Sequence, residues 1–154
     1  MGVSYNTSLS FKFENKEVEQ QLADILKNCS PYPIDSSGPK TAEDFKALLL
    51  KVFPSKEKEI DDFLQLDHNY LRPFKHLINS IEHVHIQKTR IKVNSVCYGD
   101  ATELVPLFMK FILAVGGMPF TCTIEDVDDP ELKLKYRVIR KGKKGGKYEI
   151  VEVE

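Results

Sequence analysis

Cysteine is scarce in this chain. It occurs three times among 154 residues, as Cys29, Cys97 and Cys122. An odd number of cysteines at wide, irregular spacing argues against a framework of paired disulfides and is typical of a reducing compartment. Residues 1–7 have neither the basic region nor the apolar core of a secretory signal peptide. We therefore expect a cytoplasmic protein.

The chain also lacks a long apolar run and a net charge of either sign. Its longest apolar stretch, residues 104–118, is interrupted by Pro106 and Lys110 and is too short to span a bilayer. The formal net charge is −1, which gives no overall attraction to nucleic acid or to anionic membranes. We expect no membrane partner, and any electrostatic steering has to come from local groups of charges.

Known catalytic motifs are missing as well. The sequence contains no serine-centred elbow, no H-E-x-x-H motif and no dinucleotide-binding fingerprint. The glycine-rich segment 142–147 resembles a phosphate-binding loop only superficially, because a strand and not a helix is predicted to follow it. We assign no catalytic residue, no metal ligand and no cofactor, and we favour a protein that acts by binding over an enzyme.

What is present is the composition of an ordinary folded domain. Hydrophobic residues make up 42% of the chain and charged residues 29%, and a chain of this length is the usual size of one domain. We therefore expect residues 1–154 to form a single α+β domain. Residues 30–40 are predicted to be a surface loop and residues 141–147 a hairpin turn.

Hydrophobic periodicity predicts strands in five places. Residues 3–13 alternate between apolar and polar, as a half-buried strand does. Residues 82–98 form a second strand, in which a change of parity implies a bulge or a tight turn near residues 87–90. Three further strands are predicted at 119–125, 132–140 and 148–153, the last two joined as a hairpin.

Helical periodicity fills most of the remaining chain. Asn15 is placed to cap a helix that runs to about Cys29, and Thr41 to cap a second that Pro54 ends. Further helices are predicted after Pro54, over residues 70–81, and from residue 100 to Gly116. We expect a mostly antiparallel sheet of about five strands, with four to five helices packed mainly on one face.

The last quarter of the chain sorts its charges into blocks. Residues 125–131 contain five acids and no base, residues 132–148 contain eight bases and no acid, and three glutamates follow. Alternation along residues 132–138 places the bases on one face of a strand and the apolar residues on the other. The simplest interpretation is a solvated outer face, with Glu149 and Glu152 balancing charge across strands and with lysines protecting a sheet edge.

The functional interpretation is docking to another protein by charge complementarity. The acidic loop would meet a basic cleft while the basic strand fixes orientation, as in a bacterial immunity protein or antitoxin that inhibits a nuclease. The predicted contact residues are four acids of the first block and three bases of the second. They are Glu125, Asp126, Asp128, Asp129, Arg137, Arg140 and Lys141.

Two alternatives stay open at this point. One is a small enzyme or metal-binding protein centred on Cys97, with His83 and His85 as base or ligands, since histidines two apart on a strand point to the same side. The other is nucleic-acid binding through the basic hairpin. Against it, no aromatic residue alternates with the basic face, and the adjacent acids would repel phosphate.

Overall fold

The protein is an antiparallel sheet with helices packed against it, so the predicted α+β class is confirmed. The computed structural model describes residues 4–29, 39, 41–64, 81–86, 91–98, 101–120, 122–126, 128–129, 131, 133–140 and 148–153. Within them, seven strands form one sheet in the order β2-β3-β1-β5-β6-β7, and β4 pairs with β1. The strands are β1 (Ser4–Lys12), β2 (Ile81–Ile86), β3 (Ile91–Tyr98), β4 (Met118–Pro119), β5 (Cys122–Asp126), β6 (Lys133–Arg140) and β7 (Tyr148–Val153).

The sheet has more strands than the sequence predicted, for two reasons. The segment 82–98 is not one strand with a bulge but two antiparallel strands, β2 and β3, which meet at the pair Ile86–Ile91. The change of parity therefore separates two strands, and residues 87–90 between them lie outside the described residues. The second reason is β4, only two residues long, which pairs with the end of β1 at Phe11 and Lys12. Two residues are too few to show a period.

The first helix begins where the sequence predicted. In α1 (Lys16–Cys29) the Asn15 side-chain oxygen accepts hydrogen bonds from the backbone N–H groups of Glu17 (3.0 Å) and Val18 (3.3 Å). Glu19 turns back and accepts a 2.8 Å bond from the N–H of Phe13, which satisfies a buried donor just before the helix. These contacts fix the angle at which the chain leaves β1 and enters α1.

The next two helices are joined by an ion-pair network. In α2 (Ala42–Val52) the Thr41 hydroxyl accepts a bond from the N–H of Asp44, the predicted cap. Lys46 on α2 lies 2.8 Å from Asp61 and 3.2 Å from Glu57, both on α3 (Glu57–Leu64). Hydrogen bonds to these two carboxylates raise the pKa of Lys46. The helix predicted over residues 70–81 lies outside the described residues except for Ile81, which begins β2.

The helix α5 (Ala101–Ala114) ends in a glycine-dependent turn. The N–H of Gly117 donates to the carbonyl of Ile112 (2.8 Å), and Gly116 has a φ of +96°. This is the geometry of a Schellman cap, whose left-handed residue is usually glycine. The turn sends the chain directly into β4, so the predicted end of this helix at Gly116 is confirmed.

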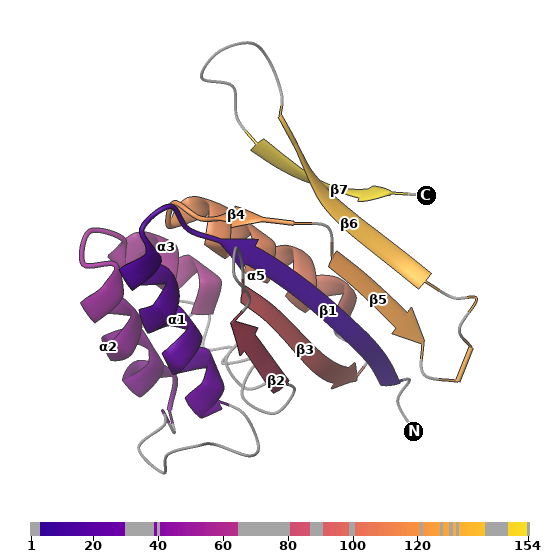
Figure 1. The fold of residues 1–154 in the computed structure, drawn as a ribbon, viewed down its shortest axis with the longest axis horizontal. Helices are drawn as coiled ribbons and strands as arrows, with labels where there is room; N and C mark the ends of the chain where they lie inside the picture. Colours follow the sequence, from indigo (N-terminus) through magenta and orange to yellow (C-terminus); the bar gives the residue numbers. More distant parts are fainter. Residues whose placement is uncertain are drawn as a thin grey trace.

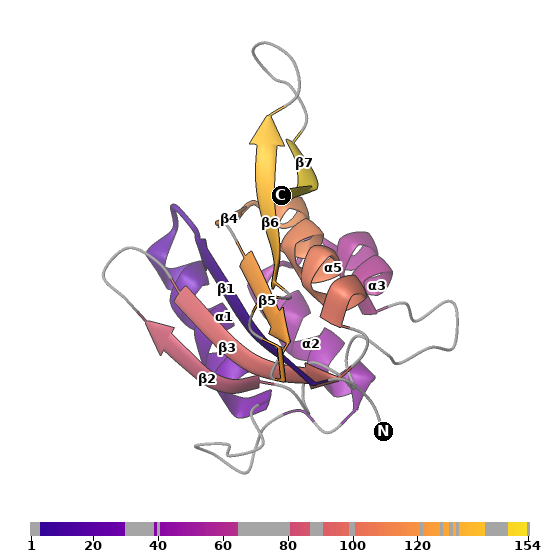
Figure 2. The same cartoon turned by 90° about the vertical axis from the view of Figure 1, so that its right-hand side faces the viewer.

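The buried residues form one cluster centred on phenylalanine rings. Phe11 and Phe13 come from β1 and the segment after it, Phe63 from α3, and Phe108 and Phe111 from α5. Helices α1, α2 and α3 gather towards the β2 end of the molecule, whereas the β6–β7 hairpin stands away from them (Figures 1 and 2). That the helices pack mainly on one face of the sheet stays a prediction.

Candidate charged docking surface

The basic strand β6 has two chemically different faces. Tyr136 is buried, and Leu134 and Val138 are half-buried against the core. Lys133, Lys135 and Arg137, which alternate with them, are exposed. Because apolar side chains anchor one face, the bases of the other face are held on a rigid strand and not on a loop. We call the side that carries these three bases the outer face.

One ion pair joins the acidic and basic blocks. Glu125 of β5 lies directly opposite Lys133 of β6, and its Oε1 is 3.2 Å from the Lys133 Nζ. Both side chains are nearly half exposed, at 43% and 46%, so the pair contributes at most about 1 kcal/mol. The contact pairs the first acid of the acidic block with the first base of the basic block. The other charges of the two blocks do not take part in it.

The other exposed bases of β6 have no acid directly opposite them. Lys135 faces Thr123 on β5 and Val153 on β7, and Arg137 faces Val151 on β7. Among the residues that the structure describes, no ion pair joins an acid to either base. Within the described part of the chain, these two positive charges of the outer face therefore have no acid at ion-pair distance.

The two glutamates of β7 do not lie directly across from these bases. Glu149 is opposite Ile139, and Glu152 is opposite Tyr136 on the face towards the core. In this register neither glutamate lies directly opposite a base of β6. Burial, and to a lesser extent the charge of Glu152, raise the pKa of the Tyr136 phenol. Tyr136 is consequently a neutral side chain that anchors the strand.

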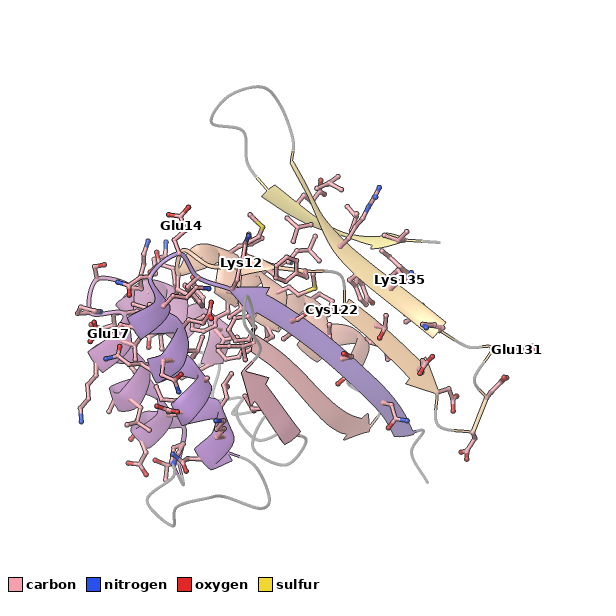
Figure 3. The ribbon with its side chains drawn as sticks, viewed as in Figure 1. Lys12, Glu14, Glu17, Cys122, Glu131 and Lys135 are labelled. Carbon is pink, nitrogen blue, oxygen red and sulfur yellow. The ribbon has the colours of Figure 1, made fainter. Side chains whose placement is uncertain are left out.

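The acidic residues occupy the connection between β5 and β6. Asp126 Oδ1 accepts a 2.8 Å bond from the N–H of Asp128, and Asp129 Oδ1 accepts a 3.2 Å bond from the N–H of Glu131. Asp128, Asp129 and Glu131 are exposed. The side-chain bonds give the loop a defined local shape. Negative charge therefore lies at one end of β6 and positive charge along the strand. Figure 3 shows Lys135 and Glu131 on the side of the molecule away from Glu14 and Glu17.

Not every predicted contact residue is described. Glu125, Asp126, Asp128, Asp129 and Arg137 lie together on β5, the connecting loop and β6. Arg140 is the last residue of β6, paired with Tyr148, but its side chain lies outside the described part of the structure. Lys141 lies entirely outside the described residues.

The register of β1, β2 and β3 gives no support to the Cys97 site. His83 pairs with Asn94 and His85 pairs with Lys92. Both histidine positions therefore belong to the face of the sheet that the even-numbered positions of β3 share. Cys97 has the opposite parity on the same strand. The side chains of these three residues lie outside the described part of the structure. Within the described part, no group of three His, Cys, Asp or Glu residues is placed to hold a metal ion.

Cys122 is a structural thiol, and this gives a first testable prediction. Its side chain is fully buried and donates to the carbonyl of Phe120 at 3.4 Å. Burial raises the pKa of the Cys122 thiol to about 12, so the reactive thiolate is scarce near neutral pH. We expect mass spectrometry after iodoacetamide treatment at pH 8 to find Cys122 unmodified in the native protein and fully modified in urea. Native labelling as fast as that of a free thiol would contradict this.

Comparisons with known proteins find no match of any kind. No family model, no curated protein and no solved structure is similar to this chain. Among the residues that the structure describes, no helix is both long and apolar enough to cross a membrane. The function therefore has to be inferred from the surface of the protein itself.

Proposed function

We propose that this protein acts by docking onto another protein through the charged surface of β5, β6 and the loop between them. The observation that carries the proposal is the arrangement of Lys135 and Arg137. Both are held exposed on a strand whose other face is anchored in the core. They stand beside, but are not directly paired with, the acids of the connecting loop.

This arrangement is suited to recognition by charge. Residues of a strand are spaced by about 3.4 Å, so the positive charges of Lys135 and Arg137 lie about 7 Å apart along β6. The acidic loop lies beyond Lys133, which is paired with Glu125. A partner with a basic cleft beside an acidic rim would match both signs at once, and a partner displaced along the strand would bring like charges together. Exposed charges also keep their hydration until a partner displaces it, so they favour fast association.

The more specific form of the proposal is an inhibitor of the immunity or antitoxin type, acting in the cytoplasm. A nuclease must present a basic cleft to bind phosphate, and an acidic loop on a rigid scaffold is complementary to such a cleft. The exposed carboxylates of Asp128, Asp129 and Glu131 would occupy it. The inhibitor would then work by occlusion, without chemistry of its own.

The test compares the wild type with a variant in which Asp126, Asp128 and Asp129 are all changed to Asn. Asparagine keeps the side-chain oxygens that accept the loop's backbone hydrogen bonds, so the fold should be retained. The matched control is Glu14→Gln, Asp24→Asn and Asp62→Asn, which changes net charge equally at exposed positions near the helices. A partner captured from native lysate is identified, purified and measured by calorimetry at two salt concentrations.

We expect the triple Asn variant to bind that partner at least about 10-fold more weakly, equivalent to about 1.4 kcal/mol. The control should bind like the wild type, and wild-type binding should weaken as salt is raised. If the partner is a nuclease, equimolar protein should abolish its activity. The proposal fails if no partner is captured, or if both variants bind it equally well.

The nucleic-acid alternative is tested with a different variant. It predicts salt-dependent binding of single- or double-stranded oligonucleotides that is lost when Arg137, Arg140 and Lys141 are neutralised. In the structure Lys133 is paired with Glu125. The outer-face residues of β5 and β7 that flank Lys135 and Arg137 are Thr123, Val151 and Val153. None of these offers the aromatic platform on which bases stack, so we favour a protein partner.

A further inference from the structure

Among the residues that the structure describes, β7 is the last strand of the sheet and pairs on one side only. Among the described residues it pairs with β6 alone, and it lies at the far end of the strand order from β2. Figure 1 shows it at the end of the molecule away from α1 and α2, with α5 the helix that contacts it. An edge strand presents N–H and C=O groups that can pair with another strand.

This edge lacks lysine and proline, two residues that commonly prevent such pairing, although it carries Glu149 and Glu152. Its sequence, Tyr-Glu-Ile-Val-Glu-Val, contains no lysine, arginine, proline or glycine, and its ladder with β6 runs from Lys135–Val153 to Arg140–Tyr148 without a shift of register. The opposite edge, β2, carries a register shift between Ile81 and His83. The lysines that the sequence suggested as edge protection lie on β6, which has neighbours on both sides.

An apolar group accompanies the open edge. Ile139, Val151 and Val153 are half-buried and share the outer face with Lys135 and Arg137. The residues of this hairpin that pack against the core, such as Val138 and Ile150, lie on its other face. The edge therefore combines unpaired backbone groups with apolar side chains that the core does not cover.

We propose that β7 pairs with β7 of a second copy of this chain, antiparallel, about a two-fold axis centred on Val151. In this register Val151 faces Val151 of the second copy, Glu149 faces Val153, and Glu152 faces Ile150. Registers centred on Glu149 or Glu152 would place glutamates directly opposite each other, which is unfavourable. A register centred on Ile150 would also keep the glutamates apart, but it would place Glu149 opposite Val151, whereas the register centred on Val151 pairs that valine with itself.

Charge complementarity across the axis supports this occupant. Val153 is the β6–β7 partner of Lys135, so Glu149 of the second copy would lie two strands from Lys135, about 10 Å between backbones. Long side chains can shorten that separation, and the contact is repeated by symmetry. Both faces stay matched, since a two-fold axis perpendicular to the sheet joins outer face to outer face. The pairing does not depend on the proposed docking function.

The expected dimer is weak. Five residues from each copy make a contact at or below the small end of specific interfaces, for which dissociation constants of about 1 µM to 1 mM are expected. Sedimentation equilibrium of the pure protein over that concentration range measures it directly. We expect a reversible monomer–dimer equilibrium and no larger species.

Two variants locate the contact. Val151→Glu places a carboxylate opposite Arg137 within one copy, which favours the folded monomer. In the dimer, the two new carboxylates of the two copies would face each other and repel. Thr123→Glu makes the matching change opposite Lys135 on β5, two strands from the edge. We expect Val151→Glu to weaken dimerisation at least about 10-fold and Thr123→Glu to leave it unchanged.

Three results of the sedimentation experiment would contradict pairing through β7. A wild type that stays monomeric to about 1 mM, a dimer that Val151→Glu does not weaken, or an open-ended assembly would each overturn it. If Val151→Glu does not fold, hydrogen exchange on the wild type replaces it. Backbone amides of residues 149–153 should then become more protected as protein concentration rises, while those of β5 do not change, and concentration-independent exchange would refute the pairing.

Discussion

Replacing Phe111 with alanine should lower the free energy of unfolding by about 3–5 kcal/mol. Phe111 lies on α5 with 3% of its surface exposed. Its ring stacks on Phe63 of α3 at 4.6 Å between centroids and meets Phe53 edge-on at 6.3 Å. One side chain thus joins α5 to α3 and to the end of α2, and its removal leaves a cavity that three elements line.

Urea unfolding followed by far-ultraviolet circular dichroism measures this change. The control is Leu107→Ala on the same helix, where the side chain is half-buried and a smaller loss is expected. Small domains have a total stability of about 5–15 kcal/mol, so Phe111→Ala should shift the midpoint strongly. A loss below about 1 kcal/mol would show that the aromatic cluster does not carry the packing that the distances indicate.

Replacing Gly117 with alanine should lower the free energy of unfolding by about 1–3 kcal/mol. A β-carbon at this position would lie 2.7 Å from Ile112 Cγ2 and 2.7 Å from Phe13 Cζ, closer than carbon atoms can approach without movement. The neighbouring Gly116 is the contrasting case. A β-carbon there meets nothing within 4 Å, but its φ of +96° makes the backbone itself unfavourable for alanine, by about 1–2 kcal/mol.

The two glycine variants separate crowding from backbone strain. In a Phe13→Leu background, one of the two clashing groups is shortened, so Gly117→Ala should cost less than in the wild type. Gly116→Ala should cost the same in both backgrounds. Chemical denaturation of the wild type, the three single variants and the two double variants measures the coupling. A neutral Gly117→Ala, or equal coupling for the two glycines, would contradict the close approach of α5 and β1 at this turn.

Local patterns predicted the elements well because each element's own residues carry the signal. The caps at Asn15 and Thr41 and the end of α5 were each predicted from one or two residues, and the structure confirms all three. The strand β1 shows one exception. Ser10 lies on the polar parity yet is 9% exposed, because the chain after β4 runs beside it and Phe120 donates its N–H to the Ser10 carbonyl at 2.8 Å.

The charged surface was predictable only in part. Alternation placed Lys133, Lys135 and Arg137 on one face of β6, and the structure agrees. Alternation could not show that Glu125 would stand opposite Lys133 while Glu149 stands opposite Ile139. Which residues face each other depends on the register between strands, and register is set by turns and by packing beyond the strand itself.

By itself the sequence determined the strands β1, β5, β6 and β7, the helices α1, α2, α3 and α5, the caps of α1 and α2, and the sorting of charge at the end of the chain. The tertiary structure alone decided that the basic strand is an interior strand, that β7 is an open edge and that Cys122 is buried at the centre of the sheet. It also placed Cys97 and the two histidine positions on opposite parities. The reason is physical, since period and propensity act between residues close in sequence, whereas strand order arises from pairing between distant segments competing for one core.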